Sequence, residues 1–139
     1  SLRDDDGAVS GTAMLSLILI AEEACEAEIT QAVMNAFVLA LKDKNSEVRS
    51  GALIGLGDLS ELSSATVNQA VIEALVTSLK DQNSEVRNYA TIVLGTIGAM
   101  KTVTLPQSAT EALRIRVRTD TSRYVRHSAR KALAKSAQK

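Results

Sequence analysis

The chain has 139 residues, of which 45% are hydrophobic and 23% are charged, and its 16 basic side chains balance 16 acidic ones. These values are typical of a folded globular protein, and they exclude a disordered chain. Aromatic residues make up only 2% and there is a single proline, so the composition favours long helices with an aliphatic core over a β-sandwich or barrel. The longest apolar stretch, residues 13–21, is far shorter than the ~20 residues of a membrane span, and its flanks lack the basic segment and cleavage site of a signal peptide.

In chain order, apolar residues that recur at helical spacing predict seven helices. They are expected at about residues 8–21, 30–42, 46–60, 67–80, 84–99, 108–118 and 122–137. The turn before residue 46 is polar, and we expect Ser46 to cap the helix that follows while Glu47 complements its N-terminal dipole. Asn83, Ser84 and Glu85 repeat this chemistry.

The sequence also repeats itself with a period of 38 residues. LKDKNSEVRSGALIGLG from Leu41 returns as LKDQNSEVRNYATIVLG from Leu79, and 17 of the 31 positions in residues 29–59 are identical in the second copy. A weaker copy lies 77 residues after the first, and a half copy precedes them all. We therefore divide a single domain into a half unit and three full units: residues 1–28, 29–66, 67–105 and 106–139.

The recurring pattern is an aspartate, Val-Arg five residues later, and then Ala and Leu at helical spacing. It resembles the HEAT repeat family, especially its short-unit, phycobilisome-lyase-like branch. The resemblance implies an all-α fold, a right-handed α-solenoid (α-α superhelix) of three helix pairs and one leading helix, with the second helices on the concave side. It also implies a structural ladder along the stack, in which aspartates bridge to arginines: Asp43, Asp81 and Asp120 with Arg49, Arg87 and Arg126.

The leading helix is apolar nearly all round and begins within a unit, although the terminal units of a solenoid normally turn a polar face outward. We therefore expect either a piece of a longer array or a helix that packs on another copy. The first interpretation is favoured because repeat architectures tolerate excision.

Catalytic signatures do not appear in the sequence. His127 is the only histidine, so the paired His-Glu motifs of HEAT-like di-iron hydroxylases are missing, and we expect no metal site, no cofactor and no catalytic residue. Gly55, Gly57 and Gly95 lie within helical periods and indicate close helix packing rather than a phosphate cradle.

The single cysteine, Cys25, has acidic neighbours that disfavour its thiolate. A lone cysteine is also compatible with a reducing compartment, so we expect an intracellular, cytoplasmic protein.

Charge is distributed unevenly along the chain. Residues 1–100 hold 6 basic and 14 acidic side chains, a net charge of −8, whereas residues 101–139 hold 10 basic and 2 acidic ones, a net charge of +8. Four arginines of the basic end form a candidate patch for an anionic partner: Arg114, Arg118, Arg123 and Arg130. Such a patch suits nucleic acid phosphates, an acidic protein or the acidic end of another copy, and the alternative is a solvated surface.

A second candidate surface lies on the second helix of each unit, opposite its core positions. It consists of Ser50, Ile54, Asn88, Tyr89, Ile92, His127 and Lys131. Isoleucines on a wet concave face indicate a protein partner, unless packing between neighbouring helices buries them. We therefore predict a non-catalytic protein-protein interaction scaffold that does not enter membranes and that self-associates in isolation. The alternatives are a nucleic-acid-binding module that uses the basic C-terminal helix pair and a HEAT-like lyase or hydroxylase relative without its active site.

Overall fold

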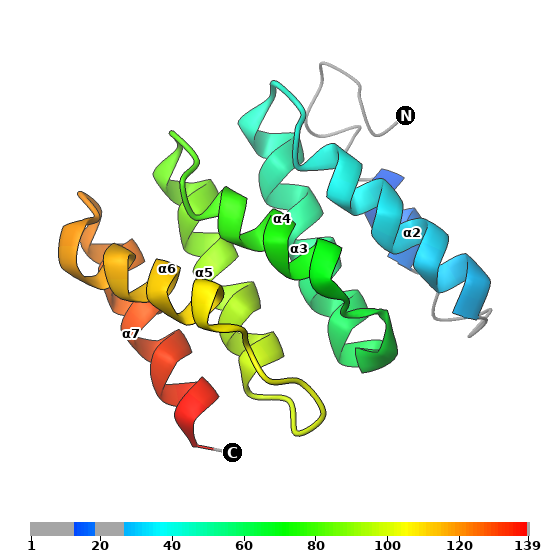
Figure 1. Ribbon diagram of the computed structural model, residues 1–139. Helices are drawn as coiled ribbons and strands as arrows, with labels where there is room; N and C mark the ends of the chain where they lie inside the picture. Colours follow the sequence, from blue (N-terminus) through cyan, green and yellow to red (C-terminus); the bar gives the residue numbers. More distant parts are fainter. Residues whose placement is uncertain (1–12, 19–26, 139) are drawn as a thin grey trace. The chain divides into compact units, whose positions relative to one another are not determined.

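Helices form all the regular structure in the part of the chain that the computed structural model describes, residues 13–18 and 27–138 (Figure 1). Residues 13–18 are helical, and they precede α2 (Ala27–Ala40), α3 (Ser46–Leu62), the short 3-10 helix η1 (Ser64–Thr66), α4 (Gln69–Ser78), α5 (Ser84–Gly98), α6 (Gln107–Thr119) and α7 (Arg123–Ala137). The order of helices confirms the predicted α-solenoid class. From α2 to α7, predicted and observed ends agree within about three residues, and η1 was not predicted. Both ends of the predicted helix 8–21, and Cys25, lie outside the described residues.

The helix caps differ from the prediction by one residue. Asn45, not Ser46, caps α3: its backbone is extended, with φ −86° and ψ 120°, and its side chain accepts a hydrogen bond from the Glu47 N–H. The prediction was wrong because the Asp43 carboxylate accepts the N–H of Asn45 at 2.9 Å and holds that residue outside the helix. The same correction applies to α5, which Asn83 caps.

The chain divides into two compact halves, Ser1–Thr66 and Val67–Lys139. In the N-terminal half, α2 packs against α3, and η1 packs against both helices. In the C-terminal half, α5 packs against α4 and α7, while α6 packs against α4 and α7 (Figure 1). The second helices of two consecutive repeats, α5 and α7, thus lie side by side, as tandem helix pairs require.

Aliphatic side chains build the core of each helix pair. The predicted stripe of α3 is completely buried: Val48, Ala52, Leu56 and Leu59. The equivalent positions of α5 are buried as well: Val86, Ala90, Leu94 and Ile97. Phe37, the only phenylalanine of the chain, is fully buried in the N-terminal half.

Two glycines of α3 allow neighbouring side chains to approach its backbone. A Cβ atom at Gly55 would lie 2.5 Å from Cζ of Phe37, and one at Gly51 would lie 2.9 Å from Sδ of Met14. The aromatic ring is rigid and fully buried, whereas the thioether sulfur is part of a flexible side chain. The close helix packing expected at Gly55 is therefore present in the structure.

We predict that Gly55→Ala lowers the free energy of unfolding by up to about 2 kcal/mol, because the buried ring cannot move away and overpacking costs about 1–3 kcal/mol. The overpacking outweighs the helix propensity that alanine adds, about 1 kcal/mol. Gly51→Ala is the matched control in the same helix, and it should be less destabilising because the Met14 side chain can change rotamer. Urea denaturation of both variants measures the difference, and an equal loss in the two would contradict this account.

Candidate functional site

Three side chains build the same turn between the two helices of each repeat. An aspartate accepts the N–H of the residue two positions later, which in turn caps the second helix. An arginine six residues after the aspartate then donates from Nη1 to the backbone carbonyl of that aspartate. The three distances are 2.9 Å for Arg49 to Asp43, 2.8 Å for Arg87 to Asp81 and 2.7 Å for Arg126 to Asp120. Each guanidinium is thereby fixed beside its own turn.

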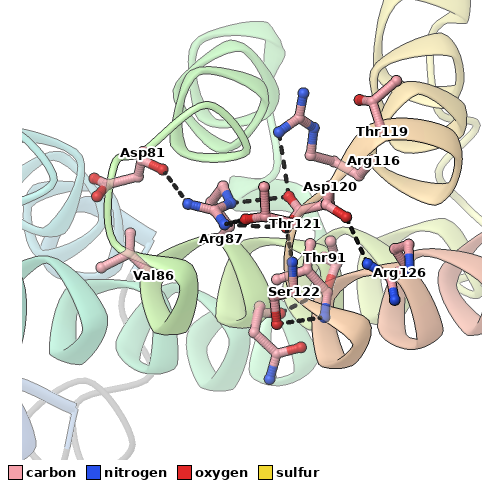
Figure 2. A network of polar contacts seen from close by, with 12 residues as sticks. Asp81, Val86, Arg87, Thr91, Arg116, Thr119, Asp120, Thr121, Ser122 and Arg126 are labelled. Carbon is pink, nitrogen blue, oxygen red and sulfur yellow. Dashed lines mark hydrogen bonds and ion pairs between the residues drawn. The ribbon is translucent and has the colours of Figure 1, made fainter.

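Arg87 also joins its repeat to the following one. Its Nε donates to Oδ2 of Asp120 at 2.9 Å and its Nη2 to Oδ1 at 3.0 Å, while Arg116 donates to Oδ2 at 3.2 Å (Figure 2). The side chain of Asp120 is inaccessible to solvent and that of Arg87 is 10% exposed. A paired, charge-assisted contact of this kind fixes both distance and orientation. It therefore positions the start of α7 beside the start of α5.

The pKa of Asp120 is set by opposing effects. Burial raises the pKa of this carboxyl, but the hydrogen bonds from Arg87 and from the Ser122 N–H lower it, as do the charges of Arg87 and Arg116. The lowering effects are stronger in sum, so the pKa lies below the ordinary value of 3.8. Asp120 is therefore ionised at neutral pH, as its two arginine partners require.

A hollow of about 220 Å³ lies between α5 and α7. Its lining residues are Thr91, Ile92, Gly95, His127, Ser128, Lys131, Ala132 and Lys135. The two helices approach closely at its floor, because a Cβ atom at Gly95 would lie 3.0 Å from both Cα and Cβ of Ala132. Ile92 of α5 lies at one side of the hollow, with 44% of its surface exposed. Lys131 and Lys135 of α7 line the other side.

The structure gathers three of the predicted concave residues, Ile92, His127 and Lys131, at this hollow. Asn88 is half-buried and accepts a hydrogen bond of 2.6 Å from Ser128 Oγ, which further ties α5 to α7. Tyr89 is half-buried and does not belong to the lining.

Sequence reasoning missed five of the eight lining residues as site residues: Thr91, Gly95, Ser128, Ala132 and Lys135. Lys135 could have been found, because it follows Lys131 by four residues and so lies on the same face of α7. Thr91 and Ser128 carry no comparable signal, since their place depends on how closely the two helices approach.

A second hollow, of about 200 Å³, lies in the N-terminal half between residues 13–18 and α3. It is lined by Met14, Leu15, Ile18, Gly51, Ile54 and Gly55, so its chemistry is apolar. Leu15 is 59% exposed and Ile54 is 42% exposed, while Ser50 is half-buried and outside the lining. Both isoleucines whose burial the sequence left open, Ile54 and Ile92, are thus accessible in the structure.

The predicted arginine patch divides into two groups. On α6, Arg114 and Arg118 share one acidic partner, Glu111, at 3.5 and 3.4 Å. On α7, Arg123 lies 5.2 Å from the centre of the Tyr124 ring, and Arg130 is exposed. The cations of α6 are therefore partly neutralised by a neighbour.

Residues 13–18 and 27–138 contain no group of three or more His, Cys, Asp or Glu side chains arranged to hold a metal ion. None of the helices within these same ranges has both the length and the apolar character needed to cross a membrane.

Comparison with known proteins identifies a family and similar solved structures. A family model described as HEAT repeats matches residues 34–134. The crystal structure of an engineered protein is similar, with a TM-score of 0.65 and 26% sequence identity, and the match covers 97% of this chain and 59% of the engineered one. The chain thus spans about three fifths of that engineered protein. No curated protein matches.

We predict that Asp120→Asn lowers the free energy of unfolding by about 3 kcal/mol at pH 7, because it removes the charge that compensates buried Arg87. The folded pKa of Asp120 lies below 3.8. The stabilisation that the ionised Asp120 carboxylate gives to the fold is therefore complete when the pH is above the pKa of this group in the unfolded chain. It is lost as the pH falls through the pKa of the group in the folded protein. The stability difference between wild type and variant should accordingly shrink below about pH 4.

Denaturation at a series of pH values measures this difference. Asp58→Asn is the control, since Asp58 is an exposed residue of α3, and it should change stability by less than about 0.5 kcal/mol. A difference for Asp120→Asn that stays constant down to pH 2 would show that the ion pair does not stabilise the fold.

Proposed function

Because this chain belongs to the HEAT repeat family, whose model matches residues 34–134, we propose that it is a non-catalytic scaffold that binds another protein along its second helices. The observation that carries the proposal is Ile92. It is 44% exposed on the rim of a hollow whose floor is made of small side chains. Exposed aliphatic surface beside a concavity is a common feature of partner-binding sites.

The surroundings of Ile92 support the same function. Tandem repeats present equivalent positions from one unit to the next, which suits an elongated partner segment. Ile54 occupies the position 38 residues earlier and is likewise exposed beside a hollow. An intracellular location, expected from the single cysteine, remains part of the proposal.

Nucleic acid binding through the basic C-terminal helix pair is the second candidate. The exposed cations of α7 favour it, whereas the pairing of Arg114 and Arg118 with Glu111 weakens the share of α6. Aromatic residues for base stacking are nearly absent from the sequence. The third interpretation is a lyase or hydroxylase relative without its active site.

Photo-crosslinking tests the protein scaffold. A benzophenone amino acid replaces Ile92 in one variant and Ile115 in the other, and both are expressed in the cells from which the sequence derives. Ile115 is the matched control because it is an isoleucine with similar exposure, 38%, on α6. We expect a discrete protein adduct from position 92 only, since a specific partner covers one surface and not the other.

Two measurements complete this test. The Ile92→Asp variant should melt like wild type, because charge at an exposed position changes stability by less than about 0.5 kcal/mol. With the photo-reactive residue at position 127, which lines the same hollow, the protein should give the adduct when Ile92 is intact and lose it when Ile92→Asp is added. Equal adducts from positions 92 and 115, or none from either, would refute the proposed binding surface.

Self-association of this chain is a separate proposal, supported by the apolar hollow beside exposed Leu15. We expect the mass measured by sedimentation equilibrium to rise with protein concentration, and to do so in high salt if apolar contact dominates over charge. Leu15→Gln should reduce the association, whereas Leu62→Gln should not, because Leu62 is similarly exposed, at 53%, but does not line the hollow. A strictly monomeric wild type at high concentration would contradict the proposal.

A further inference from the structure

We propose that the hollow between α5 and α7 binds an acidic segment of the partner protein, with an aliphatic side chain against Ile92 and carboxylates on Lys131 and Lys135. This inference rests on the proposed scaffold function and names the chemistry of the partner. It draws on charge, spacing and the shape of the hollow.

The charge of α7 is entirely of one sign. The helix carries five lysines and arginines and no aspartate or glutamate: Arg123, Arg126, Arg130, Lys131 and Lys135. No acidic residue lines the hollow, and Lys131 and Lys135 are exposed without an ion-pair partner among residues 13–18 and 27–138. A cleft lined by one sign of charge attracts and orients a ligand of the opposite sign.

The spacing of the basic side chains suits a peptide. His127, Lys131 and Lys135 follow one another at intervals of four residues on one face of α7, which is about 6 Å per interval along the helix. Carboxylates two residues apart on an extended segment are separated by about 6.6 Å, and those four residues apart on a helix by about 6 Å. Either conformation places one carboxylate at each of the two lysines.

The shape of the hollow suits a single aliphatic side chain. At about 220 Å³ it is smaller than an ordinary small-molecule pocket, which is about 300–1,000 Å³. Its floor is apolar where Gly95 meets Ala132, and Ile92 forms one wall. The aliphatic stem of Lys131 can extend along the opposite wall while its ammonium group stays in water.

A protein segment fits this site better than a nucleic acid does. Bases of a single strand bind by stacking on aromatic rings, and no aromatic residue lines the hollow. Both tyrosines of the chain lie outside the lining, and the Tyr124 ring lies under the Arg123 guanidinium. A partner segment with a leucine flanked by glutamates matches this site, because the leucine can contact Ile92 while the glutamates pair with Lys131 and Lys135.

Fluorescence anisotropy with synthetic peptides tests the inference at low salt. One probe alternates Glu and Leu so that it suits the extended arrangement, and another carries Glu at every fourth position in a helix-forming sequence with Leu between. About eight to twelve residues suffice, since an extended chain spans about 3.3 Å per residue and the helix α7 is about 22 Å long. Control peptides replace every Leu with Ser or every Glu with Lys, and a duplex DNA of about 20 base pairs is the nucleic acid probe.

Two adjacent residues of α7 provide a matched pair of variants. Lys131 lines the hollow and Arg130 does not, although both are exposed. Lys131→Glu should weaken binding of the acidic peptide about tenfold, since it turns an attraction into a repulsion. Arg130→Glu makes the same change of net charge, and its effect should stay within about twofold because solvent screens it from the hollow. Circular dichroism checks that both variants keep their helices.

The expected result is that at least one acidic peptide binds, that the Ser control binds about tenfold more weakly, and that only Lys131→Glu reduces affinity. Binding of neither acidic peptide would overturn the inference, as would equal effects of Lys131→Glu and Arg130→Glu. So would binding of the DNA alone. Because the crosslinking at position 92 is independent of partner charge, an adduct there without peptide binding would refute the acidic chemistry and leave the scaffold function intact.

Discussion

The ion pair between Arg87 and Asp120 fixes the geometry on which the C-terminal half of the chain depends. Arg87 is anchored to its own turn by the carbonyl of Asp81 and to the following repeat by both oxygens of the Asp120 carboxylate. One residue thus determines where a helix begins and where its neighbour lies. Without that contact, the register of α7 along α5, and with it the position of the hollow, would rest on one hydrogen bond, from Ser128 to Asn88, and on apolar packing, which is not directional.

Small residues then decide how closely the helices approach. Gly95 and Ala132 bring α5 and α7 together, and Gly55 admits the ring of Phe37 against α3. Larger side chains at these places would separate the helices and change the shape of the surface above them. The same positions that stabilise the core therefore also create the space in which Ile92 and Lys131 face one another.

The sequence was sufficient to predict the repeat, the helices and most of the core. The 38-residue period and the buried stripe of Val48, Ala52 and Leu56 required only spacing. The cap at Asn45 was missed because it depends on the Asp43 carboxylate holding the backbone extended, which spacing does not encode. The exposure of Ile92 and the place of Ser128 in the hollow depend on the distance between two helices, and that distance follows from side-chain packing in three dimensions.

The hollow between α5 and α7 combines tightly held helix backbones with exposed lysine side chains that keep their rotamer freedom. Its helices are tied by the Arg87 pair at one point, by the hydrogen bond from Ser128 to Asn88 at a second, and by the Gly95 contact at a third. A ligand that enters therefore finds a backbone already in place, so that little conformational entropy of the backbone is lost on binding. What becomes ordered is the pair of lysine side chains, whose rotamer freedom amounts to about 2 kcal/mol each. In the proposed site, a fixed apolar surface is thus combined with charged groups that can adapt to different carboxylate positions, which would let one site accept several related sequences.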